Sequence, residues 1–121
     1  MSVRGVRGAT TVTRDEVAEV LLATENLALE MAKANGFEPE DIASVIVSTT
    51  PDLKCVFPAK AVRSLDGWKY VPVMCTHEMD VPGGMPMCIR IMMHVNLELK
   101  QMDVTHIYQN EAIKLRPDLQ K

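Results

Sequence analysis

One long amphipathic segment constrains the fold of this chain more than any other feature of the sequence. Hydrophobic residues recur between Val17 and Met31 with the three- and four-residue spacing of a single buried helix face. The run TRDE at positions 13–16 has the form of a capping box, in which the first hydroxyl and the last carboxylate satisfy each other's exposed backbone donors. Asn35 and Gly36 supply a helix stop. The sequence therefore predicts that its longest helix begins at this box and ends near residue 35.

Short segments with strand character surround this helix. Residues 2–9 read as a first strand that ends in an arginine, with Val3, Gly5 and Arg7 on one side. Residues 89–95 alternate strictly, which places Arg90 on the side away from the aliphatic residues. Further strands are predicted at residues 44–48, 70–75 and 104–108, one helical turn at 39–41, and a short helix from Pro58 to Asp66 and Gly67. This order predicts one α+β domain over residues 1–121, a mixed β-sheet with one long and one short helix.

Composition and charge exclude several classes of protein. With 47% hydrophobic and 24% charged residues, the chain has the composition of a globular protein and not of a disordered one. Its net charge of −3 provides no general field that would attract nucleic acid. No run approaches about 18 apolar residues and no leader-like segment opens the chain, so we expect a cytoplasmic protein without a membrane span. The three cysteines form no CxxC pair, which predicts reduced thiols.

The stretch CTHEMDVPGGMPMCIR at positions 75–90 permits three chemistries. A metal site would need side chains to converge, but the spacing of its potential ligands fits no closed zinc pattern; these are Cys75, His77, Glu78, Asp80 and Cys88. A thiol catalyst would need a neighbouring base or a helix start. Cys75 has His77 nearby but no predicted helix start, and Cys55 and Cys88 are expected to act as small hydrophobic residues. Both readings are weaker than the third.

The third chemistry is recognition of an anion by arginines. Arginine suits carboxylates because its planar fork donates two parallel, charge-assisted hydrogen bonds. The candidate cations and their polar neighbour are Arg7, Arg63, Arg90, Arg116, Lys60 and Tyr108. A single arginine is usually a solvated surface charge. Arg7 and Arg90 differ because each lies in, or at the end of, a strand of small or apolar residues, where an unpaired guanidinium would be costly.

Several runs of the sequence resemble one family. They are RGVRGATTV at positions 4–12, TPDLKCVFPAKAVR at 50–63, GWKYVPVMC at 67–75, EMDVPGG at 78–84, CIRIMMHV at 88–95 and LRPDL at 115–119. In order and in a chain of this length, they resemble the monofunctional chorismate mutases of the bacillus type. The resemblance implies a small cytoplasmic homotrimer with a barrel-like core and active sites between neighbouring subunits. It also implies conversion of chorismate to prephenate without metal or cofactor.

The same resemblance implies roles for individual residues. Arg7 would clamp a substrate carboxylate, assisted by Tyr108, Arg63 and Arg116. Arg90 would donate to the ether oxygen, while Glu78 and Cys75 would bind the ring hydroxyl; Arg90, Glu78 and Arg7 are thus the expected catalytic residues. The walls of the site would be Phe57, Ala59, Lys60, Val73, Met74 and Leu115. Members of the family typically have threonine where this chain has Met74, so a contact through that hydroxyl is not expected here.

Two other functions fit the same arginines. One is a noncatalytic trimeric module that binds a small carboxylate. The other is a trimer like the enamine and imine deaminases, which also place an anion-binding arginine at a subunit interface. Turnover of chorismate separates the family reaction from the first, and ammonia release separates it from the second.

Overall fold

The computed structural model describes residues 2–116 and 118. Strands and helices alternate irregularly along the chain, in the order β1 (Ser2–Thr11), α1 (Val17–Asn35), β2 (Ile42–Thr49), α2 (Ala59–Arg63), β3 (Val73–His77), β4 (Cys88–Leu97) and β5 (Ile107–Tyr108). The described residues also form three 3-10 helices: η1 (Pro39–Asp41) lies between α1 and β2, η2 (Gln101–Asp103) lies between β4 and β5, and η3 (Asn110–Leu115) follows β5. The predicted α+β class, with a mixed sheet and few helices, is confirmed.

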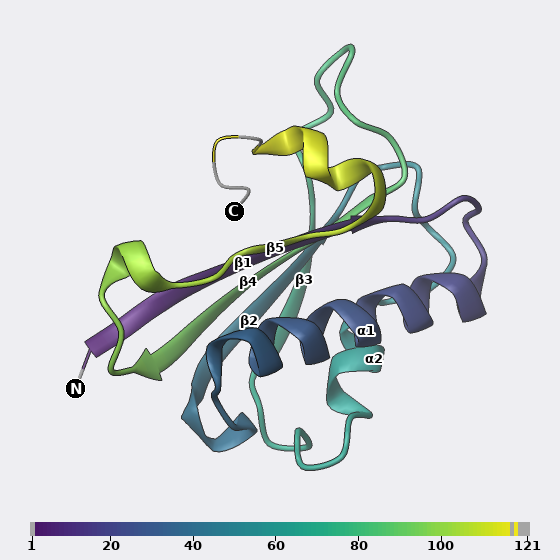
Figure 1. Cartoon of the computed structure of the whole chain (residues 1–121). Coiled ribbons are helices and arrows are strands. Elements are labelled where there is room, and N and C mark those ends of the chain that lie inside the picture. Colours follow the sequence, from purple (N-terminus) through teal and green to yellow (C-terminus); the bar gives the residue numbers. More distant parts are fainter. Residues whose placement is uncertain (1, 117, 119–121) are drawn as a thin grey trace.

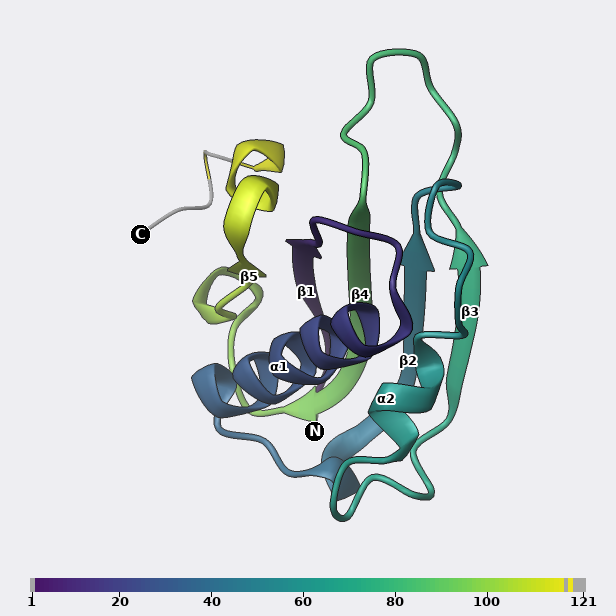
Figure 2. The ribbon, with the colours of Figure 1, turned by 90° about the vertical axis from the view of Figure 1, so that its right-hand side faces the viewer.

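The five strands form one sheet in the order β3-β2-β4-β1-β5 (Figure 2). The central strand β4 runs antiparallel to both of its neighbours, β1 and β2. The outer strands are parallel to theirs, β3 to β2 and β5 to β1. Of the helices, α1 and α2 lie on one face of the sheet, and η3 lies on the other side (Figure 1). The long helix therefore has one sheet face on which to bury its apolar stripe.

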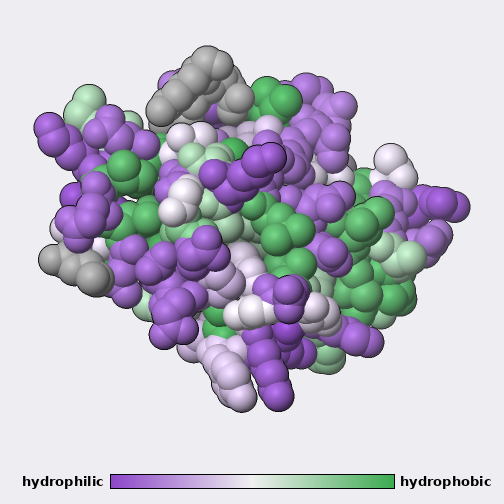
Figure 3. Space-filling model, turned by 60° about the horizontal axis from the view of Figure 1, so that its bottom comes forward, coloured by the Kyte–Doolittle hydropathy of each residue, from purple (hydrophilic) through white to green (hydrophobic). Residues whose placement is uncertain are grey.

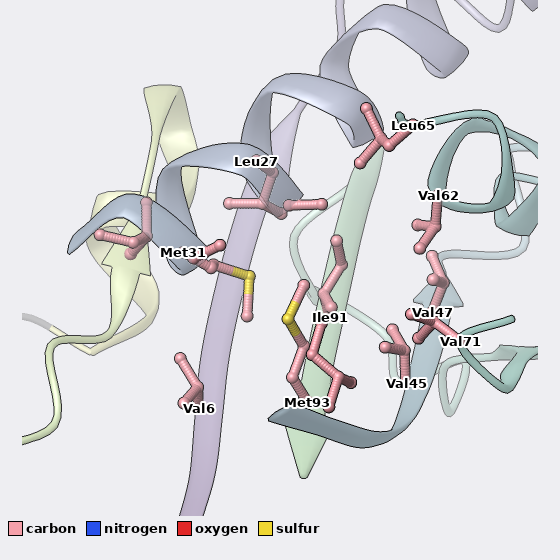
Figure 4. Packing of buried hydrophobic residues seen from close by; sticks show 14 of the residues in the cluster. Val6, Leu27, Met31, Val45, Val47, Val62, Leu65, Val71, Ile91 and Met93 are labelled. Carbon is pink, nitrogen blue, oxygen red and sulfur yellow. The ribbon is translucent and has the colours of Figure 1, made fainter. Parts of the chain in front are cut away.

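The core fills the space between the sheet and these two helices (Figure 4). Leu27 and Met31 of α1 are fully buried there, with Met93 of β4. Gly8 of β1 permits the close approach of α1, because a Cβ at this position would lie 3.1 Å from the Leu27 Cδ1 atom and closer still to the Met31 sulfur. Seen from the helix side, the outer surface is mainly polar with separate hydrophobic patches (Figure 3). No described helix has both the length and the apolar character needed to span a bilayer.

The start of α1 differs from the prediction. The Thr13 hydroxyl donates to the Glu19 carboxylate, at 3.0 Å to Oε1, and not to a partner within a capping box. Glu16 is the N-cap residue, with extended backbone, and makes no side-chain capping bond. Asp15 instead accepts hydrogen bonds from the backbone N–H groups of Lys54 and Cys55. Because Asp15 is held by this distant loop, the helix begins at Val17, four residues after Thr13.

Other element ends were also predicted wrongly. β1 runs through Thr11 and does not end at Arg7, because β4 pairs with it along its whole length. β3 begins only after Pro72, which cannot donate a ladder bond, and its carbonyl accepts from the Val45 N–H at 2.8 Å. The strand predicted at 104–108 is reduced to the two residues of β5, and the short helix ends at Arg63, before Asp66 and Gly67. η3 was not predicted.

Candidate active site

Arg7 and Arg90 lie on the sheet face opposite α1 and α2. Alternation fixes this for β1, because the neighbouring Gly8 faces Leu27 and Met31 of α1. On β4, the two residues flanking Arg90 are buried, whereas Arg90 itself is exposed. Arg90 pairs with Ala9 in the β1–β4 register, which makes Arg7 its diagonal neighbour on the same face. The prediction from alternation is confirmed for Arg90.

Glu78 comes to the same region from the end of β3. Its backbone N–H donates to the Thr49 carbonyl at 2.8 Å, which ties the chain after β3 to the end of β2. Its Oε1 atom lies 3.6 Å from the Arg90 Nε atom, and the two side chains are 27% and 44% exposed. An ion pair between side chains this exposed to solvent contributes little to stability. The pair matters for the geometry of the site, because the Glu78 carboxylate orients the Arg90 guanidinium.

Tyr108 supplies a buried hydroxyl group to the same region of the sheet. The residue is 9% exposed, and its hydroxyl makes no hydrogen bond within the described part of the chain. Tyr108 pairs with Ala9 in the β1–β5 register, and these two residues form a small apolar cluster with Ala112 and Leu115. Native proteins rarely leave a buried hydroxyl unsatisfied. A ligand oxygen bound at this position could accept a hydrogen bond from the Tyr108 hydroxyl.

Arg116 extends this region toward the C-terminus. Its Nε and Nη2 atoms donate to the two carboxylate oxygens of Asp118 at 3.1 and 3.0 Å. This pairing raises the pKa of Arg116, with a further contribution from Tyr108, and lowers the pKa of Asp118, with a further contribution from Arg7. The surroundings of these residues thus favour a carboxylate. Pro117 and Leu119, from the same LRPDL run, lie outside the described residues.

A second group of predicted site residues lines a cavity elsewhere in the chain. The cavity has a volume of about 740 Å³ and lies between β3, α2 and the segment that joins β2 to α2. Phe57, Lys60, Arg63 and Cys75 are among the residues that line it. The short α2 places Lys60 and Arg63 three residues apart on one face. The cavity therefore combines an exposed aromatic ring with two cations.

The remaining wall residues do not all belong to this cavity. The buried Ala59 contacts it indirectly, because its backbone N–H donates to the Cys75 sulfur at 3.3 Å. Val73 packs against the main core. Met74 is 70% exposed and, by alternation with Cys75, faces the opposite side of the sheet. The predicted walls are therefore not one continuous surface within a single chain.

The predicted residues thus form two groups that a single chain does not bring together. Group one consists of Arg7, Glu78, Arg90, Tyr108, Leu115 and Arg116. Group two consists of Phe57, Ala59, Lys60, Arg63, Val73 and Cys75. Met74 belongs to neither group by position, because the strand register places it on the same sheet face as Arg7. The 740 Å³ cavity is lined by no member of group one. Arg7 and Arg90 lie on the sheet face opposite the helices, whereas this cavity lies beside α2.

The environments of Cys55 and Cys88 oppose thiol chemistry there. Burial, with a hydrogen bond to Asp15, raises the pKa of Cys55 to about 11. Burial raises the pKa of Cys88 to about 11 as well, although Arg90 acts in the other direction. Both groups therefore stay as thiols at neutral pH. Among residues 2–116 and 118, no three His, Cys, Asp or Glu side chains are arranged to hold a metal ion.

One contact of the site was not anticipated from the sequence. The backbone N–H of Arg7 donates to the Nδ1 atom of His106 at 3.0 Å. β5 starts only at Ile107, so an imidazole replaces the backbone carbonyl that a longer strand would offer. The one available signal was the two-residue spacing between His106 and Tyr108, which the predicted strand already placed on the same side.

The family model for chorismate mutase type I matches residues 3–119. The chain belongs to this family. The family match covers both groups of site residues, and it confirms the resemblance found from the short sequence runs.

Individual relatives agree with this assignment. The chain is 50% identical over 119 residues to chorismate mutase AroH of Bacillus subtilis (strain 168), covering 98% of this chain and 94% of the relative. It is 43% identical over 119 residues to chorismate mutase AroH of Thermus thermophilus, covering 98% and 97%. Its fold is similar to the solved structure of a chorismate mutase from Clostridium thermocellum. That match has a TM-score of 0.86 and 45% identity, and it covers 89% of this chain and 96% of that one.

Proposed function

We propose that this protein is an isomerase that rearranges chorismate to prephenate, a step of aromatic amino-acid biosynthesis. Membership of the type I chorismate mutase family supports this function over the carboxylate-binding module and the deaminase-like trimer. The geometric observation that carries it is the Arg90–Glu78 pair, 3.6 Å apart, on the face that also holds Arg7. This face combines two arginines with the Tyr108 hydroxyl, which makes no hydrogen bond within residues 2–116 and 118.

The reaction needs no proton transfer. One C–O bond breaks while one C–C bond forms within the same molecule, and negative charge grows on the ether oxygen as the C–O bond stretches. In the proposed mechanism the Arg90 guanidinium donates to that oxygen. A donor placed in advance at a developing charge elsewhere contributes about 2.7–4 kcal/mol. Glu78 holds the Arg90 fork in place, so the donor does not need to reorient during the reaction.

The second catalytic task is to hold a flexible dianion in its compact reactive conformer. Arg7, Tyr108 and Arg116 are proposed to bind substrate carboxylate, with Arg63 assisting from group two. The unsatisfied Tyr108 hydroxyl supports this assignment, and so does the way Arg116 and Arg7 lower the pKa of the Asp118 carboxyl. Restricting the substrate in this way lowers the entropy that must be lost in the transition state. Glu78 and Cys75 are proposed to bind the ring hydroxyl.

We infer that the complete site forms between two subunits of a cytoplasmic homotrimer with a barrel-like core. The split of the predicted residues into two groups supports a shared site. So does an apolar row on the sheet face opposite the helices, formed by Met74, Ile46 and Met92, which are neighbours in the strand register. Met74 and Ile46 are 70% and 39% exposed in the single chain. Packing this row against other subunits would remove it from water. No metal or cofactor is required.

Mixing the purified protein with chorismate and following the loss of the ultraviolet absorbance of chorismate tests the function directly. We expect turnover that is abolished by Arg90→Ala and retained by Arg14→Ala, which removes an exposed arginine outside both groups. Binding of chorismate without any loss of absorbance would support the module instead. Release of ammonia from an enamine, without chorismate turnover, would support the deaminase.

A further inference from the structure

The chain just after β2 holds the chain just before β4 through side-chain hydrogen bonds. The Asp52 carboxylate accepts from the Met87 backbone N–H at 2.9 Å and from the Thr50 hydroxyl. The Thr50 hydroxyl oxygen in turn accepts from the Cys88 N–H at 3.0 Å, and the Thr50 N–H donates to the Cys88 carbonyl at 3.0 Å. We refer to Thr50, Asp52, Met87 and Cys88 as the β2–β4 corner.

Met87 needs this support because its backbone is strained. Its φ angle is 54°, in the left-handed region that non-glycine residues adopt only at a cost. The Met87 carbonyl accepts from the Val12 N–H at 2.9 Å, so both of its backbone polar groups are engaged. The Asp52 carboxylate therefore stabilises a conformation that the Met87 side chain disfavours.

The β2–β4 corner lies next to the Arg90–Glu78 pair. Cys88 opens β4, and Arg90 is the third residue of that strand. The loop of residues 79–87 leaves the sheet after Glu78 and returns to it at Met87 (Figure 2). Thr49, immediately before the corner, accepts the Glu78 N–H at 2.8 Å. Residues 49–52 thus hold both ends of this loop. In doing so they set the position of the Arg90 guanidinium relative to the Glu78 carboxylate.

We propose that Asp52 is a positioning residue for Arg90, which acts by holding Met87 in its left-handed conformation. The inference rests on the proposed function, because it concerns the geometry of the same site. Without the carboxylate, Met87 would relax toward a negative φ and the first residues of β4 would shift. Displacing a catalytic group by about 1 Å can cost up to about 10²-fold in rate.

The test compares Asp52→Ala with the double variant Asp52→Ala/Met87→Gly. We expect Asp52→Ala to lower kcat for chorismate about 10-fold and to change KM less than about twofold, because Arg90 acts mainly in the transition state. Glycine adopts a φ of 54° without strain, so the double variant should regain most of the lost kcat. Met87→Gly alone should stay within about twofold of the wild type.

Matched variants distinguish positioning from a general loss of stability. Asp66→Ala removes an exposed carboxylate that lines a cavity at the other end of the molecule, and it should leave kcat unchanged. If Asp52→Ala does not fold, Asp52→Leu replaces it, because leucine has a similar branched shape but no acceptor for the Met87 N–H. An unchanged kcat in the Asp52 variant, or a loss that Met87→Gly does not relieve, would overturn the proposal. Absence of turnover by the wild-type protein would overturn the proposed function instead.

Discussion

Arg90 shows which features of a predicted site residue follow from the local sequence and which depend on the fold. Strict alternation along residues 89–95 was enough to predict its direction, because side chains in a strand alternate whatever the strand pairs with. Its partners could not be predicted in the same way. Glu78 reaches it only because the chain after β3 is tied to Thr49, and Ala9 lies beside it only through the β1–β4 register. Contacts between distant segments depend on the fold.

Replacing Arg90 by lysine tests the need for a planar fork. The Arg90→Lys variant keeps the positive charge but lacks the planar fork, so it cannot both pair with Glu78 and donate to the ether oxygen in the geometry that arginine provides. We expect kcat to fall at least about 10²-fold, which corresponds to about 2.7 kcal/mol of transition-state stabilisation. The measurement is the steady-state loss of chorismate absorbance. Arg14→Lys, at a largely exposed position, is the matched control, and near-normal turnover by Arg90→Lys would remove Arg90 from its role.

Tyr108 offers a residue at which stability and binding should respond in opposite directions. Because the buried hydroxyl makes no hydrogen bond in the described chain, Tyr108→Phe loses no bond in the free protein. We expect the free energy of unfolding to stay the same or rise by up to about 1 kcal/mol, while the KM for chorismate rises about 10-fold. Urea unfolding and steady-state kinetics measure the two effects. A clear loss of stability would show that the hydroxyl already has a partner.

At the scale of elements, sequence periodicity identified the helices and long strands, but it made β5 too long and did not predict η3. The 19-residue α1 and the 10-residue β4 repeat their patterns often enough to be recognised. β5 has two residues and pairs with a strand about a hundred positions earlier. η3 likewise depends on distant contacts, since the Asn110 side chain donates to the Thr10 hydroxyl oxygen at 3.1 Å. Tyr108 and Leu115 lie in these two elements.

The N-terminal end of α1 should give stability a measurable dependence on pH. The Thr13 backbone N–H donates to the Glu19 carboxylate and, with the other bonds there, holds the pKa of Glu19 below its ordinary value of 4.5. Stability from this group is complete above pH 4.5 and is lost as pH falls through the lower, folded-state pKa. Glu19→Gln should therefore reduce the drop in Tm between about pH 5 and about pH 3. Thermal unfolding followed by circular dichroism measures this drop.

Glu25→Gln provides the comparison, since it removes the same charge from the same helix without disturbing the Thr13 contacts. Its drop in Tm should match that of the wild type. If Glu19→Gln and the wild type lose the same Tm over this pH range, the Thr13–Glu19 contact does not contribute to the acid response. The predicted capping box would have assigned this response to Glu16, so the same experiment also tests the corrected start of the helix.

At the scale of the whole molecule, the sequence predicts which residues belong to the site but not how the fold divides them. The short runs that resemble the family contain both groups, apart from Tyr108, in mixed order along the chain. Only the sheet separates Arg7 and Arg90, on one face, from the cavity lined by Lys60 and Arg63. If each site combines group one of one subunit with group two of another, defects in different groups should complement each other.

Complementation between subunits makes this arrangement testable. Arg90→Ala is defective in group one, and the double variant Lys60→Ala/Arg63→Ala is defective in group two. Each alone should have little activity. When equal amounts are unfolded together and refolded, about a quarter of the sites should combine two intact halves, so about a quarter of wild-type activity should return.

Two variants of the same group provide the control for this mixing. Arg90→Ala and Arg7→Ala are both defective in group one. Every site in the mixed trimers therefore retains one defect, and no activity should return. Sedimentation of the wild-type protein should give the mass of a trimer. A strict monomer, or equal recovery in both mixtures, would contradict a site shared between subunits. In that case the exposed row of Ile46, Met74 and Met92 would need another partner, because a single chain leaves Ile46 and Met74 facing water.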